Sequence, residues 1–172
     1  NDTEQLFKWI TYLSNFNSDK YFYGDTGMYY LPYIKLIIQK YPNVKIIGLV
    51  RDKESVVNSY LNKTEGRNHW YNHNGKEWRF DKKWDDCFPK YNEGNKLKAL
   101  ESYYDEYNEI TKRLMNKFPQ HVRLWGIEEF NTYKGKTEIL DFIEYDLERE
   151  ISKNYISNKN NFSIIKLLKK WI

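Results

Sequence analysis

Two polar residues of one short segment, Arg51 and Ser59, have the types and the spacing to bind an anion. Arg51 directly follows an apolar run at residues 44–50, and ligands of open α/β sheets bind beyond the carboxyl ends of the strands. A helix that begins just after Arg51 presents backbone N–H groups to a phosphate, and a guanidinium matches two phosphate oxygens. Ser59 lies about two helical turns further on and can add its hydroxyl. The alternative is an Arg51 paired with Asp52 or Glu54, and a Ser59 on an ordinary helix face.

A second polar candidate, Asp25, lies in the segment Gly24-Asp25-Thr26-Gly27. This segment follows a predicted strand at residues 21–23 and precedes a predicted helix at 31–40, which is the setting of a phosphate-binding loop. Two glycines alone are weak evidence for such a loop. In the simpler interpretation, Asp25 fixes a glycine-rich turn or caps the next helix.

The elements that must position these residues alternate between helix and strand. Helical spacing of apolar residues predicts an amphipathic first helix from Leu6 to Phe16, and strands are predicted at residues 44–50 and 122–127. The run at 44–50 is almost continuously apolar, the pattern of a central parallel strand covered on both faces. Further helices are predicted at residues 54–62, 96–117, 136–144 and 163–172. The sequence therefore predicts one α/β domain over residues 1–172, with a parallel sheet flanked by helices.

The segment from Tyr41 to Tyr60 resembles the signature of sulfotransferases that use 3′-phosphoadenosine 5′-phosphosulfate as donor. That family has a Pro-x-x-Lys-hydrophobic strand, then Arg-Asp-Pro or Arg-Asn-Pro, then a helix in which Ser precedes Tyr. The resemblance implies a three-layer fold similar to that of P-loop NTPases, and it assigns the donor's 3′-phosphate to Arg51 and Ser59. Lys53 replaces the usual proline and leaves both phosphate ligands in place.

Weaker similarity extends over about three quarters of the chain. Tyr23-Gly24-Asp25-Thr26 resembles the family's strand-Gly-Glu/Asp-Lys-Ser turn, and residues 122–130 resemble its strand ending in Tyr-Glu-Asp-Leu. In several members an acidic residue at the position of Asp25 is the general base for the acceptor, so the resemblance makes Asp25 a candidate catalytic base. Thr26 departs from the family's lysine, which puts a strictly homologous mechanism in doubt.

The family's Pro-Lys-Ser-Gly-Thr-Thr loop, which wraps the 5′-phosphosulfate, has no counterpart in the chain. Sulfuryl transfer needs backbone N–H groups and a lysine where charge develops on the oxygens. The simplest expectation is a domain incomplete at its N-terminus, with the loop upstream of Asn1. A degenerate protein that only binds and an unfamiliar phosphosulfate site are the alternatives.

Residues 64–93 lack clear periodicity and form an aromatic-rich excursion, predicted to be ordered and long enough to be functional. It could be a lid over an acceptor site, or it could simply pack on the domain. His69 and His73 with Cys87 invite a zinc interpretation, but a His-x₃-His pair with one distant Cys is weak evidence. We expect no metal, and neither histidine lies in a family motif for the catalytic base.

Composition bounds the partners and the compartment. The chain carries 28 Lys and Arg against 24 Asp and Glu, a net charge of +4 that suits an anionic ligand without forming a basic stripe for nucleic acid. It contains no run of about 18 apolar residues, so no membrane span is expected. The single Cys87 is compatible with a reducing compartment and favours the cytoplasm weakly.

Two classes of function follow. The first is sulfuryl transfer to a hydroxyl or amine of a small-molecule, carbohydrate or peptide acceptor. The second is a catalytically inactive nucleotide- or partner-binding domain that retains the 3′-phosphate site. A third, P-loop kinase-like interpretation would require a triphosphate and Mg²⁺. The sequence leaves the acceptor and the oligomeric state open.

Overall fold

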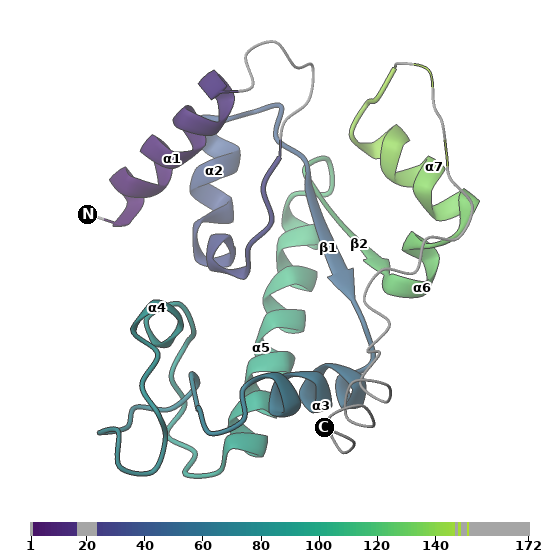
Figure 1. Cartoon of the computed structure of the whole chain (residues 1–172). Helices are drawn as coiled ribbons and strands as arrows, with labels where there is room; N and C mark the ends of the chain where they lie inside the picture. Colours follow the sequence, from purple (N-terminus) through teal and green to yellow (C-terminus); the bar gives the residue numbers. More distant parts are fainter. Residues whose placement is uncertain (1, 17–23, 147, 149–150, 152–172) are drawn as a thin grey trace, which may run out of the picture.

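A computed structural model describes residues 2–16, 24–146, 148 and 151 of the 172-residue chain (Figure 1). The predicted strand at 21–23 and the predicted helix at 163–172 lie outside these residues. The described part is α/β. Its elements, in chain order, are α1 Asp2–Phe16, the 3₁₀ helix η1 Met28–Tyr33, α2 Ile34–Lys40, β1 Ile46–Val50, α3 Lys53–Lys63, α4 Lys82–Asp85, α5 Lys96–Lys117, β2 Val122–Gly126, α6 Ile127–Phe130 and α7 Tyr133–Phe142.

Within the described residues the sheet has two strands, β1 and β2, which pair in parallel with Ile46 opposite Val122 and Val50 opposite Gly126. The chain between them includes the long helix α5, as a parallel connection requires. Gly48 lies opposite Leu124, and a Cβ at Gly48 would come within 2.2 Å of the Leu124 side chain. The glycine therefore gives the Leu124 side chain room to lie across β1.

One face of the sheet is packed against helices. Ile34 and Ile38 of α2 form a buried cluster with Val122 of β2, and Leu114 and Phe118, from α5 and its C-cap, pack against it. Ile46 is paired with Val122, and paired residues point to the same face of the sheet, so Ile46 packs against the same cluster. This side of the sheet therefore forms a core between α2, α5 and the strands.

The other face is covered over β2 only. Trp125 packs with Ile139 and Phe142 of α7, whereas Ile47 and Leu49 of β1 are 37% and 41% exposed. The expectation that the strand at 44–50 is covered on both faces is therefore wrong for the described part of the molecule. An apolar run in a strand does not reveal whether a second helix reaches it, and α7 packs on the neighbouring strand instead.

The excursion at residues 64–93 is ordered as predicted, although α4 is the only helix that the structure describes in it. Trp70 is fully buried and Phe88 nearly so, in a cluster with Val57 of α3 and with Ala99 and Leu100 of α5. Aromatic packing onto two helices thus replaces regular secondary structure as the source of order in this segment.

Candidate functional site

The turn after β1 places Arg51 where the sequence predicts it, at the carboxyl end of a parallel strand and at the start of a helix. Figure 1 shows β1 leading into α3 at this turn. Asp52 is the N-cap of α3, and its carboxylate accepts a 2.8 Å hydrogen bond from the Ser55 N–H. That hydrogen bond holds the pKa of Asp52 below its usual value. One N–H group that was expected to be open to a phosphate is therefore already satisfied by the chain itself.

The guanidinium of Arg51 is only loosely engaged. Its Nε lies 4.0 Å from a carboxylate oxygen of Asp52, and half of the side chain is exposed. The ion pair with Asp52 that was the alternative interpretation is present only at this long distance, where an exposed pair contributes little free energy. The guanidinium thus has N–H groups available for an external anion.

Ser59 lies on α3, and it is partly buried. Among the described residues, its hydroxyl has no hydrogen-bond partner. The helix rises about 9 Å from Lys53 to Ser59 at 1.5 Å per residue, so an anion held by both Ser59 and Arg51 must lie along the face of α3. The structure therefore leaves both predicted ligands free but does not bring them into contact.

The backbone of the Arg51 turn is held by α5. The Tyr104 hydroxyl donates a 2.5 Å hydrogen bond to the Arg51 carbonyl, and Lys53 Nζ forms a 2.6 Å ion pair with Asp105. The neighbouring carboxylate of Asp105 raises the pKa of Lys53. Consecutive residues of α5 thus fix the two ends of the turn.

Asp25, the predicted base, is engaged by four donors. Its carboxylate accepts hydrogen bonds from the Trp9 indole at 3.1 Å, the Thr26 N–H at 2.8 Å, the Tyr29 hydroxyl at 3.3 Å and the Tyr30 hydroxyl. The bond from Tyr30 is the main cause that holds the pKa of Asp25 below its usual value, while burial and Asp25 together raise the pKa of Tyr30. Donors that stabilise the carboxylate make it a weaker base.

The two candidate segments approach each other through α5 rather than directly. The Tyr103 hydroxyl donates to the Met28 sulfur at 2.8 Å, and the adjacent Tyr104 bonds to Arg51. Within the described residues, no hydrogen bond or ion pair joins Asp25 to Arg51 or Ser59. The candidate residues for binding the sulfate donor and for deprotonating the acceptor therefore do not form one contact network among the described residues. Their segments contact adjacent residues of α5 instead.

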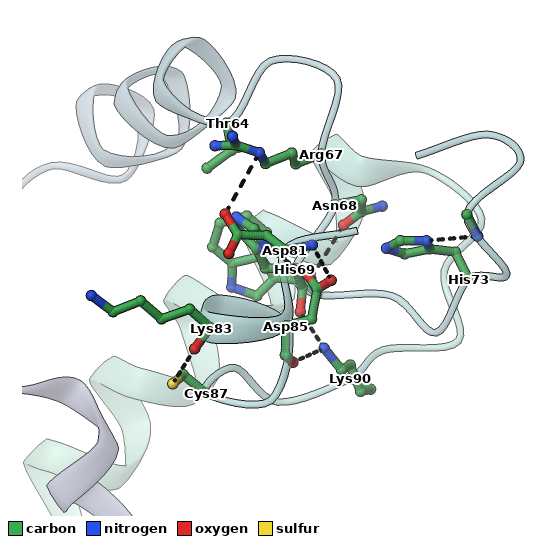
Figure 2. A network of polar contacts seen from close by, with 12 residues as sticks. Thr64, Arg67, Asn68, His69, His73, Asp81, Lys83, Asp85, Cys87 and Lys90 are labelled. Carbon is green, nitrogen blue, oxygen red and sulfur yellow. Dashed lines mark hydrogen bonds and ion pairs between the residues drawn. The ribbon is translucent and has the colours of Figure 1, made fainter. Parts of the chain in front are cut away.

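The excursion contains a polar network that the sequence analysis did not find (Figure 2). His69 is almost fully buried, and its Nδ1 lies 2.6 Å from one carboxylate oxygen of Asp85. The other carboxylate oxygen of Asp85 accepts a 2.8 Å hydrogen bond from the Asp81 N–H. Lys90 Nζ donates to the backbone carbonyls of His69, at 2.7 Å, and of Asp85. His69 and Asp85 are sixteen positions apart in a largely irregular segment, so no spacing rule could have paired them.

A histidine oriented by a carboxylate is also the arrangement of a general base. Here the imidazole is stacked on Phe88, with ring centroids 5.8 Å apart, and lies against Trp70 at 5.6 Å. Its side chain is only 4% exposed. This environment makes the pair a cross-link that closes the excursion.

The three residues considered for zinc have separate partners. His73 stacks on Phe80 and accepts from the Gly75 N–H, while the Cys87 thiol contacts the Lys83 carbonyl at 3.2 Å. Across the described ranges, no group of three or more His, Cys, Asp or Glu side chains is arranged to hold a metal ion. In the same ranges, no helix has both the length and the apolar character to cross a membrane.

A surface hollow lies away from all of these residues. It is lined by Met115, Asn116, Pro119, Val122, Arg123 and Leu124. These residues surround the amino end of β2, whereas Arg51 follows the carboxyl end of β1 in a parallel sheet. The hollow is therefore at the wrong end of the strands to serve the Arg51 turn.

Comparison with protein families, with curated proteins and with solved structures finds no match for this chain.

Proposed function

We propose that this chain is a sulfotransferase-like domain whose Arg51 turn binds the 3′-phosphate of 3′-phosphoadenosine 5′-phosphosulfate. One observation carries the proposal. Beside a capped helix, Arg51 is held only by a 4.0 Å ion pair with Asp52, and the Ser59 hydroxyl has no hydrogen-bond partner among the described residues, while the backbone between the strand and the helix is held by α5. Free side chains on a fixed backbone are what an anion site needs, because binding then costs little reorganisation.

The chemistry of the turn suits a phosphate dianion. The guanidinium can donate two parallel N–H groups to two phosphate oxygens, and the Ser59 hydroxyl can donate a further hydrogen bond. The positive end of the α3 dipole adds a favourable field. The carboxylate of Asp52 opposes it, so Arg51 must supply most of the attraction.

In the proposed transfer reaction, a hydroxyl or an amine of a small molecule, a carbohydrate or a peptide attacks the donor's sulfur, and Asp25 takes the proton of the acceptor. The bond from sulfur to the 5′-phosphate oxygen breaks, and adenosine 3′,5′-bisphosphate leaves. Because Tyr30 and three other donors occupy the carboxylate, one of them must turn away before Asp25 can accept that proton. Transfer also requires a loop for the 5′-phosphosulfate, which none of the 172 residues supplies.

The occupied carboxylate of Asp25 favours a second candidate function, in which the domain binds the nucleotide without transferring the sulfuryl group. An assay of sulfuryl transfer separates the two. Transfer of radiolabelled sulfate from the donor to a panel of hydroxyl and amine acceptors supports the enzyme, whereas donor binding without transfer to any acceptor supports a binding domain.

Calorimetric titration tests the shared part of both candidates. The chain is titrated with adenosine 3′,5′-bisphosphate and, separately, with adenosine 5′-phosphate, which lacks the 3′-phosphate. We expect the bisphosphate to bind more tightly, and Arg51→Ala to remove that preference. Arg113→Ala is the matched control, because Arg113 is an exposed arginine of α5 that pairs only loosely with Glu109, at 3.7 Å.

Equal affinity of the unaltered chain for both nucleotides would contradict the proposal. A preference for the bisphosphate that persists in Arg51→Ala would show that the 3′-phosphate binds at another site. A preference lost equally in Arg113→Ala would show that general charge, rather than the Arg51 turn, attracts the nucleotide.

A further inference from the structure

The strand-to-helix turn that carries Arg51 is held at two adjacent points by α5. The Tyr104 hydroxyl donates to the Arg51 carbonyl at 2.5 Å, and the Asp105 carboxylate holds Lys53 Nζ at 2.6 Å. The Lys53 ammonium also lies 6.0 Å from the centre of the Tyr104 ring. The two contacts enclose Asp52, the N-cap of α3, between them.

The backbone of the turn has the conformation that a proline would impose. Asp52 has φ −59° and ψ 143°, outside the helical region, and this ψ is within the range to which a residue before proline is restricted. Lys53 is the first residue of α3, the position at which proline is most readily accepted in a helix. The sulfotransferase signature has its proline at this position, and this chain has Lys53.

We propose that Tyr104 is a positioning residue for the 3′-phosphate site, and that the Lys53–Asp105 ion pair assists it, so that α5 gives the turn the shape that proline gives elsewhere. The inference rests on the proposed function. In this account Tyr104 does not touch the ligand. It fixes the Arg51 backbone relative to α3, and hence the point from which the Arg51 side chain extends.

The two contacts are expected to differ in the free energy that each contributes. A hydrogen bond from a tyrosine to a backbone carbonyl is worth about a two- to tenfold change in an equilibrium constant. The Lys53–Asp105 pair is exposed, with side chains 40% and 62% accessible, so it should contribute less. Tyr104→Phe should therefore have a larger effect than Asp105→Asn.

The test measures the ratio of affinities for adenosine 3′,5′-bisphosphate and adenosine 5′-phosphate in each variant. A general loss of stability would affect both nucleotides, whereas a misplaced Arg51 affects only the one with a 3′-phosphate. We expect Tyr104→Phe to lower the ratio by about two- to tenfold. Tyr107→Phe is the control, because it removes a hydroxyl from the next turn of the same helix without touching the Arg51 turn.

A rescue experiment makes the test specific. Adding Lys53→Pro to Tyr104→Phe should restore the ratio, because the ring fixes the turn from within. Proline is sterically acceptable here, since Asp52 already has the required conformation. A purely structural role of Tyr104 elsewhere in the fold would not be rescued by a proline at position 53.

Hydrogen exchange of the amides of residues 51–55 gives a readout that needs no ligand. Faster exchange in Tyr104→Phe than in Tyr107→Phe, with an altered nucleotide ratio, supports the inference. An unchanged ratio, or a ratio that Lys53→Pro does not restore, overturns it. If the unaltered chain does not distinguish the nucleotides, the proposed function fails, and unchanged exchange in Tyr104→Phe then overturns the positioning role as well.

Discussion

The Arg51 turn and the Asp25 loop are opposite in how they use their polar groups. At the Arg51 turn the backbone is fixed by Tyr104, while the Arg51 and Ser59 side chains are left free. At the Asp25 loop the side chain itself is the fixed part, because four donors from α1, η1 and the loop converge on one carboxylate. A side chain with unused hydrogen-bonding groups is available to a ligand, whereas a side chain whose hydrogen-bonding groups are all occupied stabilises the fold.

This difference favours the prediction that Arg51 binds an anion over the prediction that Asp25 is a catalytic base. The free guanidinium at the end of a parallel strand fits the anion-binding role that the signature implies. The saturated carboxylate of Asp25 fits the simpler interpretation of an aspartate that fixes a turn, and the catalytic role requires a rearrangement.

Charge reversal at the free side chain should have the largest effect. Arg51→Glu replaces two charge-assisted hydrogen bonds by repulsion, and we expect affinity for adenosine 3′,5′-bisphosphate to fall at least about 100-fold. Affinity for adenosine 5′-phosphate should change far less, and the melting temperature should stay near that of the unaltered chain because the side chain is half exposed. Comparable losses for both nucleotides would place Arg51 outside a 3′-phosphate site.

Removal of the second free group should have a moderate effect. Ser59→Ala deletes one hydroxyl donor, and calorimetry should show about a three- to tenfold loss for the bisphosphate. Ser55→Ala is a comparison one helical turn earlier, where both the backbone N–H and the side chain of Ser55 interact with the Asp52 cap, so its loss should weaken the cap rather than remove a ligand. Equal effects of the two substitutions would argue against a ligand role for Ser59.

At the saturated region we expect a change of stability rather than of binding. Asp25→Asn weakens the hydrogen bonds from Trp9 and the tyrosines and should lower the free energy of unfolding by about 1 kcal/mol, since the site is largely solvated. Asp146→Asn is the control, because Asp146 is exposed and makes no hydrogen bond or ion pair among the described residues.

The same variant has a predicted pH dependence. The folded-state pKa of Asp25 lies below the unfolded value of 3.8, so its contribution to stability is fully present above that value and is lost as the pH falls through the folded pKa. The stability difference between the unaltered chain and Asp25→Asn should therefore shrink on acidification. A difference that is independent of pH would show that the carboxylate charge is not what the four donors stabilise.

The smallest expected effect has the opposite sign. Asp52→Asn keeps a good N-cap for α3 but removes the negative charge beside Arg51. Affinity for the bisphosphate should rise by about two- to threefold, less at high salt because the charges are exposed. Weaker binding would mean that the Asp52 carboxylate positions Arg51, despite their 4.0 Å separation.

The local elements were the most predictable part of the molecule. The helix predicted at 96–117 is observed with those bounds, and the strands at 44–50 and 122–127 are confirmed to within two residues at each end. Periodicity and a following proline are local signals, and they determine such elements directly. The helix predicted at 31–40 begins instead as the 3₁₀ helix η1, with Pro32 inside it.

Tertiary contacts were less predictable. The exposure of Ile47 and Leu49 depends on where α7 packs, and the His69–Asp85 pair depends on how an irregular segment closes. The hydrogen bond from Tyr104 to Arg51 joins residues 53 positions apart. No pattern within either segment signals these contacts. The positions of Arg51 and Ser59 after a strand were predictable, but the loose engagement of Arg51 and the saturation of Asp25 were not.

Phosphorus-31 NMR can follow the two phosphates of adenosine 3′,5′-bisphosphate individually, because they give separate resonances. On addition of the chain, we expect the 3′-phosphate resonance to shift and broaden, and we expect Arg51→Ala to abolish this response. A response confined to the 5′-phosphate, or a 3′ response that persists in Arg51→Ala, would contradict the assignment of the Arg51 turn as the 3′-phosphate site.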